Sequence, residues 1–286
     1  MAAEILQLLV FGVVVGSVLA LGAIGVSLVF AILRFANFGH GDLMTVGAYV
    51  AFVLVAGLGF PLLVALPFAI AGAALVAVAV DQTVFRRLRG RGPLVLLISS
   101  FGMALVLRNV IQLVWGVDTK VYDPGIQLPI VVGDVRIRPD HLTIAGAALV
   151  LVTLMWLFLQ KTRTGKAMRA MADNVDLARV SGIDAERVIL WTWILGGGLA
   201  GAAGVLLALD TRLFPLLGAN QILPIFAATI LGGIGRPYGA IAGGFVIGIA
   251  SELSTLVIEP VYKPAVAFAI MVLVLIARPS GIFAGR

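Results

Sequence analysis

The sequence contains no cysteine and only two histidines, His40 and His141, among its 286 residues. The absence of cysteine excludes disulfide bonds, thiolate catalysis and thiolate metal ligands. The two histidines are far apart in sequence and no spaced carboxylates accompany them, so we predict no metal site. Charged residues are also scarce, at 12% of the chain. Little of the chain is therefore suited to a surface that water covers.

Long polar segments are missing as well. The gaps between apolar runs reach only about 25 to 30 residues, whereas a soluble domain usually needs about 50 or more. The nearest match to a phosphate-binding loop is Gly165-Lys166, but Ala167 follows it and no glycine stands five residues earlier. We also find no Gly-x-Ser-x-Gly motif. The sequence thus argues against a soluble catalytic domain, an ATP site of its own and a membrane enzyme.

Long apolar runs take the place of these missing features, and 61% of all residues are apolar. About 20 apolar residues cross a bilayer as a helix. The run 43–80 is long enough for two crossings, folded at the glycines and proline of 57–61. The run 222–234 is short enough to be a re-entrant half-helix. The runs are 5–33, 43–80, 94–114, 142–159, 188–209, 222–234, 240–258 and 265–277.

These runs predict an all-α polytopic membrane protein with about 8–10 transmembrane helices, with room for broken or re-entrant helices, in a single transmembrane domain over 1–286. Glu4 is the only charge before Ile5, so we expect a retained first helix and no signal peptide. Short loops rich in Lys and Arg stay in the cytoplasm, which places 81–93 and 161–187 inside and 115–141 outside. The prediction is nine crossings, an external N-terminus and a cytoplasmic tail with Arg278 and Arg286. The same topology explains the net charge of +6, so we predict no nucleic-acid binding.

Glycine motifs occur inside the apolar runs. Gly196-x-Gly198-x-x-Gly201 matches a dinucleotide-binding fingerprint as a string, but it lies in an apolar helix without a preceding strand. Small residues four apart allow close approach of helices in lipid. We therefore interpret this motif as a helix-packing surface.

The longest basic gap, 161–188, predicts two short helices outside the membrane. In the first, Met168 and Met171 share one face and Lys166, Arg169 and Asp173 the opposite one. In the second, Asn174 is a suitable N-cap, Asp176 and Arg179 complement the helix dipole, and Gly182 suits a left-handed exit. From periodicity alone, an amphipathic linker on the bilayer surface and a docking element for a partner both fit.

Two polar, glycine-containing segments interrupt the runs. Polar groups at membrane depth face a cavity or a partner, so both segments are candidates for a substrate pathway. The alternative is that both are cytoplasmic turns. A lone histidine such as His40 is more often a structural hydrogen-bonding group than a proton carrier. The candidate residues are Asn37, Gly39, His40, Gly41 and Asp42 in the first segment and Gly232, Gly233 and Gly235 in the second.

Glu252 is the one acidic residue well inside a predicted crossing. Such a carboxylate needs a partner or water. Arg108, in the middle of another run, is a candidate partner. A structural ion pair and a role in the substrate pathway remain equally open.

Three sequence motifs show that the chain resembles the branched-chain amino acid permease family of bacterial ABC transporters, specifically its H-type membrane subunit. The resemblance covers nearly the whole length. It is carried by Asn37-Phe38-Gly39-His40-Gly41-Asp42, by 164–170 through Gly182-Ile183, and by Leu231-Gly232-Gly233-Ile234-Gly235-Arg236-Pro237-Tyr238-Gly239-Ala240. The importer signature Glu-Ala-Ala, three residues, Gly is matched in part, because Leu177 replaces the first alanine.

The resemblance implies a permease subunit, not an enzyme, in the bacterial cytoplasmic (inner) membrane. It implies a second permease subunit in a heterodimer, an external solute-binding protein, and two cytoplasmic ATPases that use ATP and Mg, with no cofactor bound by this chain. Loop 161–188 would then couple to the ATPases. The residues expected to do so are Arg169, Asn174, Asp176, Ala178, Arg179 and Gly182.

The implied substrate is a branched-chain or related neutral amino acid. Similar permeases carry urea or short amides, and that alternative stays open. A proton-coupled secondary transporter that titrates Glu252, Asp42 or Asp210 is a further alternative, and it would need no ATPase.

Overall fold

The computed structural model describes residues 2–122, 128–133, 135–278 and 281–282, so Arg286 of the predicted tail lies outside the described residues. In chain order, the α-helices are α1 (Ala2–Leu33), α2 (His40–Phe52), α3 (Leu62–Val80), α4 (Arg86–Leu88), α5 (Pro93–Trp115), α6 (Pro139–Lys161), α7 (Arg163–Asp173), α8 (Val175–Val180), α9 (Ala185–Asp210), α10 (Ile222–Gly232), α11 (Pro237–Leu253) and α12 (Lys263–Ala277). Two π-helical turns (Val53–Gly57 and Asp81–Phe85) continue α2 and α3. Short 3-10 turns cover Arg89–Arg91, Ala219–Gln221, Ser254–Leu256 and Pro260–Tyr262, and two strands, β1 (Ile130–Val132) and β2 (Val135–Ile137), pair antiparallel.

Within the described part of the chain, eight helical segments are long and apolar enough to cross a membrane, and a shorter apolar helix covers Ala219–Gly232. The prediction of an all-α polytopic membrane protein with broken helices is therefore confirmed. Several helices begin at a proline in their first turn, where the missing N–H costs no hydrogen bond. Asp184 caps α9 by accepting a hydrogen bond from the Arg187 amide at 3.2 Å.

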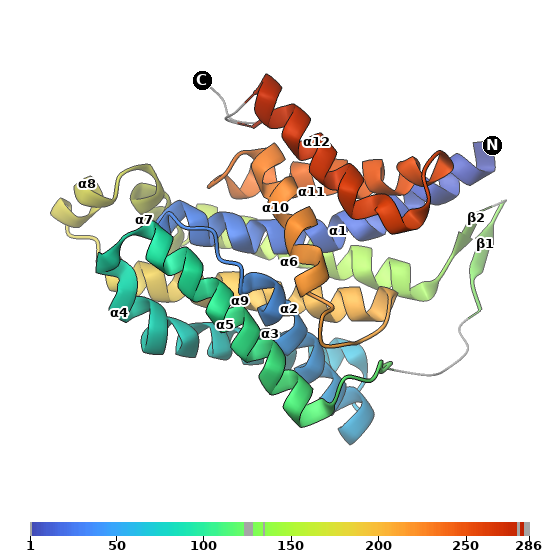
Figure 1. Ribbon diagram of the computed structural model, residues 1–286, viewed down its shortest axis with the longest axis horizontal. Helices are drawn as coiled ribbons and strands as arrows, with labels where there is room; N and C mark the ends of the chain where they lie inside the picture. Colours follow the sequence, from blue (N-terminus) through green and yellow to red (C-terminus); the bar gives the residue numbers. More distant parts are fainter. Residues whose placement is uncertain (1, 123–127, 134, 279–280, 283–286) are drawn as a thin grey trace.

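The helices run mostly along the long axis of the molecule, so loops gather at two opposite ends (Figure 1). Helices α4, α7 and α8 lie at one end, here called the α7–α8 end. The β1–β2 hairpin and the start of α1 lie at the other, called the hairpin end. The basic loops 81–93 and 161–187 thus share one end, as their charge predicts. The last described residues lie near the α7–α8 end, where the Ile282 amide donates to the Leu231 carbonyl at 2.9 Å.

Helices α1 and α9 form the core. Helix α1 packs along α11, α9 and α10, whereas α9 packs against α1, α2 and α3. Helices α3, α5, α6 and α12 carry about half of the exposed large apolar side chains of the described residues. Because lipid is as apolar as these side chains, such an arrangement suits a bilayer without a polar outer layer.

The glycines of α9 allow this close packing. An added Cβ at Gly197 or Gly201 would meet Ala77 or Ala73 of α3, and one at Gly196 would meet Val29 of α1. The interpretation of this motif as a helix-packing surface is confirmed, since it lies in the middle of a buried helix.

We expect Gly204→Ala to destabilise the protein by about 1–3 kcal/mol, the usual effect of overpacking. Its Cβ would lie 2.5 Å from the Met44 carbonyl carbon on α2, and backbone atoms cannot move aside easily. Thermal unfolding in detergent measures the change. Gly146→Ala is the control, because an added Cβ there meets nothing within 4 Å. Equal unfolding midpoints for the two variants would show that α2 and α9 are less tightly packed than described.

Two non-helical segments enter the bundle from opposite ends. Residues 34–39 leave α1 at Leu33 and turn back, so that the His40 ring lies against Gly25, eight residues or about 12 Å back along α1. Residues 211–218 enter from the hairpin end, where Leu213 exchanges two backbone hydrogen bonds with Lys120. The two segments come together at the start of α2, where Gly41 contacts the backbone of Gly218.

Candidate functional site

The first predicted polar segment lies inside the bundle and is fully packed. Asn37, Gly39, His40, Gly41 and Asp42 are all buried. Asn37 Oδ1 accepts a hydrogen bond from the Gly39 amide at 3.0 Å, and Ser100 Oγ of α5 accepts one from the Phe38 amide at 3.1 Å. These bonds satisfy a backbone that has left the helical ladder, as apolar surroundings require. The segment is therefore enclosed by the bundle, and its side chains and backbone are not exposed at the surface.

The second predicted segment lies elsewhere. Gly232 is the last residue of α10, and Gly233 and Gly235 lie in the turn between α10 and α11 at the α7–α8 end. The segment that meets the first one inside the bundle is 211–218, which the sequence analysis did not single out. Thr45 Oγ1 accepts a hydrogen bond from the Gly218 amide at 3.0 Å. Pro215 and Gly218, just before a short apolar run, were the available signal.

Where the two segments meet, an ion pair joins α2 to α5. Arg108 donates from Nε and Nη2 to the two carboxylate oxygens of Asp42, at 3.1 and 3.3 Å. The Asp42 side chain is 1% exposed and that of Arg108 is 22% exposed. Arg108 therefore does not pair with Glu252, the partner considered from the sequence.

An aromatic cluster lies beside the same segments. The Phe38 ring makes edge contacts with Phe101 of α5 and Phe226 of α10, with centroids 6.3 and 5.1 Å apart. Phe101 is exposed, whereas Phe38 and Phe226 are half-buried. The non-helical segment 34–39 therefore contacts, through the half-buried Phe38, an exposed side chain of α5.

Glu252 lies near the end of α11, at the hairpin end. Both of its carboxylate oxygens accept hydrogen bonds from Lys263 Nζ at 2.7 Å. A cavity of about 580 Å³ opens there, and His141, Asp210 and Arg138 also line it. Glu252 thus lies within the candidate membrane span Pro237–Leu256, one residue before α11 ends and a 3-10 turn continues it.

We expect Glu252→Ala to lower uptake more than it lowers the amount of assembled protein, because it leaves the Lys263 ammonium unpaired beside this cavity. Transport into proteoliposomes, normalised to reconstituted protein, measures the effect. The swapped pair Glu252→Lys/Lys263→Glu separates two roles: recovered uptake assigns a structural ion pair. Unchanged uptake in Glu252→Ala would reduce Glu252 to a helix-packing residue.

At the opposite end, the loop 161–188 folds as the sequence predicts. Helices α7 and α8 are separate, and Asn174 Oδ1 caps α8 by accepting from the Asp176 and Leu177 amides, both at 3.0 Å. Gly182 has φ +83°, the predicted left-handed exit. Met168 and Met171 are buried, as their spacing predicts.

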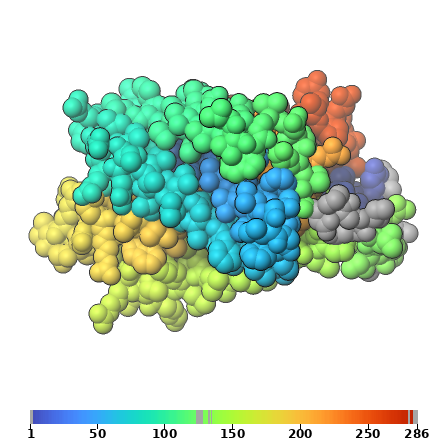
Figure 2. Space-filling model, turned by 90° about the horizontal axis from the view of Figure 1, so that it is seen from below, coloured from blue at the N-terminus to red at the C-terminus, as the bar shows by residue number. Residues whose placement is uncertain are grey.

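Helix α8 projects from the bundle. Figure 2 shows it (yellow) standing out at one end of the molecule. Ala178 is buried, whereas Asn174, Asp176, Arg179 and Gly182 are exposed. Two apolar side chains that the sequence analysis did not select, Leu177 and Val180, are 64% and 87% exposed. A projecting helix with bare apolar side chains is typical of a docking element.

Arg169, which the sequence analysis expects to couple to the ATPases, lies between α7 and the end of α6. It is half-buried and donates to the Leu159 carbonyl at 2.5 Å and to Gln160 Oε1 at 2.9 Å, so it holds α7 against the end of α6. Gln160 Nε2 donates in turn to Tyr238 Oη at 2.8 Å, which links α6 to the start of α11. The three side chains form one polar chain from α7 to α11.

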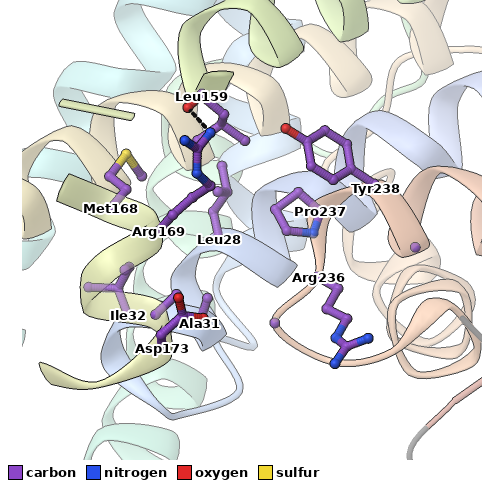
Figure 3. A pocket seen from close by; sticks show the side chains of 13 residues that line it. Leu28, Ala31, Ile32, Leu159, Met168, Arg169, Asp173, Arg236, Pro237 and Tyr238 are labelled. Atoms are coloured by element: carbon purple, nitrogen blue, oxygen red, sulfur yellow. Dashed lines mark hydrogen bonds between the residues drawn. The ribbon is translucent and has the colours of Figure 1, made fainter. Parts of the chain in front are cut away.

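A cavity of about 520 Å³ lies between α7, the end of α1 and the turn that contains Gly235. Figure 3 shows Arg169 with its bond to Leu159 on one side and Pro237 and Tyr238 on the other. Arg34, directly after α1, has φ +58°, and its Nη2 donates to the Ala172 carbonyl of α7 at 2.6 Å. A non-glycine residue in this conformation costs about 1–2 kcal/mol. The end of α1 is therefore tied to α7.

Comparison with known proteins agrees with this architecture. The chain is 34% identical to the high-affinity branched-chain amino acid transport system permease protein LivH of Escherichia coli K12, over 97% of this chain and 94% of that protein. It is 33% identical to the corresponding BraD of Pseudomonas aeruginosa (97% and 95% covered), and 30% identical to a probable LivH of Methanocaldococcus jannaschii (94% and 90%).

Among solved structures, PsaBC from Streptococcus pneumoniae in complex with Fab shares the fold, with a TM-score of 0.50, 16% identity and coverage of 96% and 95%. The family model described as branched-chain amino acid transport system / permease component matches residues 8–275. The chain therefore belongs to this family of membrane transport permeases, and it is a multi-pass transport component rather than an enzyme.

Proposed function

We propose that this chain is the membrane-spanning permease subunit of an ATP-driven importer in the bacterial cytoplasmic membrane. It translocates branched-chain or related neutral amino acids that an external binding protein delivers. Two cytoplasmic ATPase subunits supply the energy from ATP and Mg, and a second permease subunit completes a heterodimer. The single observation that carries the proposal is the projecting α7–α8 unit on a chain whose residues 8–275 match the family.

The ATPases contact α8, through Leu177 and Val180 together with the exposed Asn174, Asp176, Arg179 and Gly182. Ala178 supports α8 from below, and Arg169 holds α7 in place. Movement of α7 reaches α11 through Gln160 and Tyr238, because hydrogen bonds join the three elements. ATP binding at this end therefore acts on the helices around the pathway.

The substrate pathway follows the outer face of α5, and the two broken segments meet behind this face, inside the bundle. Asn109 is exposed in the middle of this face, although its neighbours Leu105, Val106 and Val110 are apolar. An amide costs free energy in lipid, so this face meets water or protein. Behind this face of α5 lie four buried residues that determine the backbone conformation where the chain leaves the helical ladder: Gly39, His40, Gly41 and Asp42. Gly232, Gly233 and Gly235 act at the α7–α8 end, and Glu252 at the hairpin end.

The test is ATP hydrolysis in liposomes by this chain co-expressed with its genomic neighbours. We expect stimulation when the binding protein carries leucine, isoleucine or valine. Stimulation by urea instead would keep the mechanism and replace the substrate. Solute transport by this chain alone, without ATPase subunits and abolished by a proton uncoupler, would contradict the importer and identify a secondary transporter.

A further inference from the structure

The cavity at the hairpin end, about 580 Å³ in volume, is lined by segments that lie far apart in the sequence. Its lining comes from the start of α1, the hairpin, the start of α6, the ends of α9 and α11 and the start of α12. Figure 1 shows that the start of α1, the hairpin and the turn between α11 and α12 gather at this end. Small-molecule sites measure roughly 300–1,000 Å³. The cavity is therefore of a size that holds one small molecule.

Two ion pairs at the cavity are complete within this chain. Both carboxylate oxygens of Glu252 accept hydrogen bonds from Lys263 Nζ, at 2.7 Å each. Arg138 Nη2 donates to Asp140 Oδ2 at 3.2 Å. Since each of these charges already has an opposite partner, no ligand is needed to neutralise them.

Two opposite charges that line the cavity are left over. Asp210, the last residue of α9, has Oδ1 at 3.5 Å from His141 Nε2, which is longer than an ordinary hydrogen bond. The Arg136 amide donates to Gln7 Oε1 at 2.8 Å, but the exposed Arg136 side chain forms no ion pair with the described part of the chain. One carboxylate and one guanidinium at the cavity therefore retain unused hydrogen-bonding capacity.

The same cavity has an apolar side, formed by Phe11, Val14 and Val15 of α1. The Phe11 ring lies edge-on to the His141 ring, with centroids 5.5 Å apart. An apolar group of a ligand gains free energy by covering such a surface. The lining thus combines a negative group, a positive group and an apolar surface.

We propose that this cavity binds the amino acid as a zwitterion before it enters the bundle. The Arg136 guanidinium binds the α-carboxylate, Asp210 accepts hydrogen bonds from the α-ammonium, and the apolar side chain lies against α1. Asp210 directly precedes segment 211–218, which leads to Gly41 inside the bundle. The site rests on the function proposed above and deepens it, because an uncharged solute such as urea gains little from two opposite charges.

The test measures ligand binding to the purified transporter complex without its binding protein. Thermal stabilisation by a ligand reports its affinity for the folded state. The probes are leucine, 4-methylpentanoate, which lacks the ammonium, and isopentylamine, which lacks the carboxylate. We expect each truncated probe to bind at least about tenfold more weakly than leucine, as the loss of a hydrogen bond to a charged group predicts.

Two single variants assign the two ends of the ligand. Asp210→Asn should weaken leucine binding at least about tenfold but leave 4-methylpentanoate unchanged, because that probe has no ammonium. Arg136→Gln should weaken leucine binding to the same extent but leave isopentylamine unchanged. The matched controls are Asp118→Asn and Arg212→Gln, which remove the same charges from exposed residues of the hairpin end that do not line the cavity. Both controls should bind leucine as the unmodified complex does.

The probes are compared within one variant, so a general loss of stability affects all of them alike. Leucine affinity that is unchanged in Asp210→Asn and Arg136→Gln would overturn the site. So would an unmodified complex that hydrolyses ATP with leucine-loaded binding protein but gains no stability from leucine itself. In both cases the importer stands and only the cavity fails. A complex with no leucine-stimulated ATP hydrolysis would instead refute the proposed function, and the site with it.

Discussion

Gly102→Leu is expected to reduce the initial rate of substrate uptake by about tenfold or more. The added side chain touches nothing in this chain, so folding and insertion should be unaffected. It projects from the exposed outer face of α5, however, and obstructs either the substrate pathway proposed there or the close approach of a second subunit. Overpacking of such a contact costs about 1–3 kcal/mol, and 1.4 kcal/mol is a factor of ten. Uptake by proteoliposomes with matched protein content measures the loss.

Gly146→Leu on α6 is the matched control. Gly146 is also exposed in the middle of a crossing, and an added Cβ there meets nothing. Its neighbours Leu142, Leu149 and Val150 are exposed and apolar, as a face in contact with lipid should be. We expect normal uptake. Equal loss in both variants would mean that the α5 face has no special role.

Val180→Asp is expected to release the ATPase subunits from the complex and to abolish ATP-driven uptake. Val180 is 87% exposed on α8, so an aspartate there is harmless to this chain alone. In an interface, the same carboxylate loses its water without a partner, at a cost of several kcal/mol. Co-purification of the ATPases with the tagged permease measures the effect, which should exceed about tenfold.

Val117→Asp supplies the comparison. Val117 is 70% exposed and lies beyond α5 at the hairpin end. The same change there should leave ATPase association intact. If Val180→Asp also co-purifies normally, α8 is a surface linker on the bilayer, and the ATPases contact another part of this end.

The sequence predicted the features that depend on local rules. Apolar run length predicted nine crossings, and the described residues contain eight long apolar helices, with the run 222–234 forming part of a shorter one. The glycines and proline of 57–61 predicted the reversal between α2 and α3. The α7–α8 unit was predictable for the same reason. The cap at Asn174, the buried methionines and the left-handed Gly182 each depend on neighbours a few residues away.

Features that depend on tertiary structure were not predictable. Hydropathy cannot show that residues 34–39 turn back along α1, because an inward turn and an end turn have the same composition. The pairing of Arg108 with Asp42 joins residues 66 apart, and its competitor Glu252 lies far along the chain. The exposure of side chains was equally unpredictable. In the sequence, Leu177 is only a departure from the importer signature, whereas in the structure it is an exposed apolar side chain on α8.

Helix α1 reaches from one end of the molecule to the other. At 32 residues it is about 48 Å long, well beyond the roughly 30 Å of a bilayer's hydrocarbon core. Near its start, Gln7 exchanges hydrogen bonds of 2.9 and 2.8 Å with the backbone of Arg136 in the hairpin. Just past its end, Arg34 holds α7. A rigid helix that is hydrogen-bonded at both ends transmits movement along its axis. A displacement of α7 on one side of the membrane therefore displaces the hairpin on the other side.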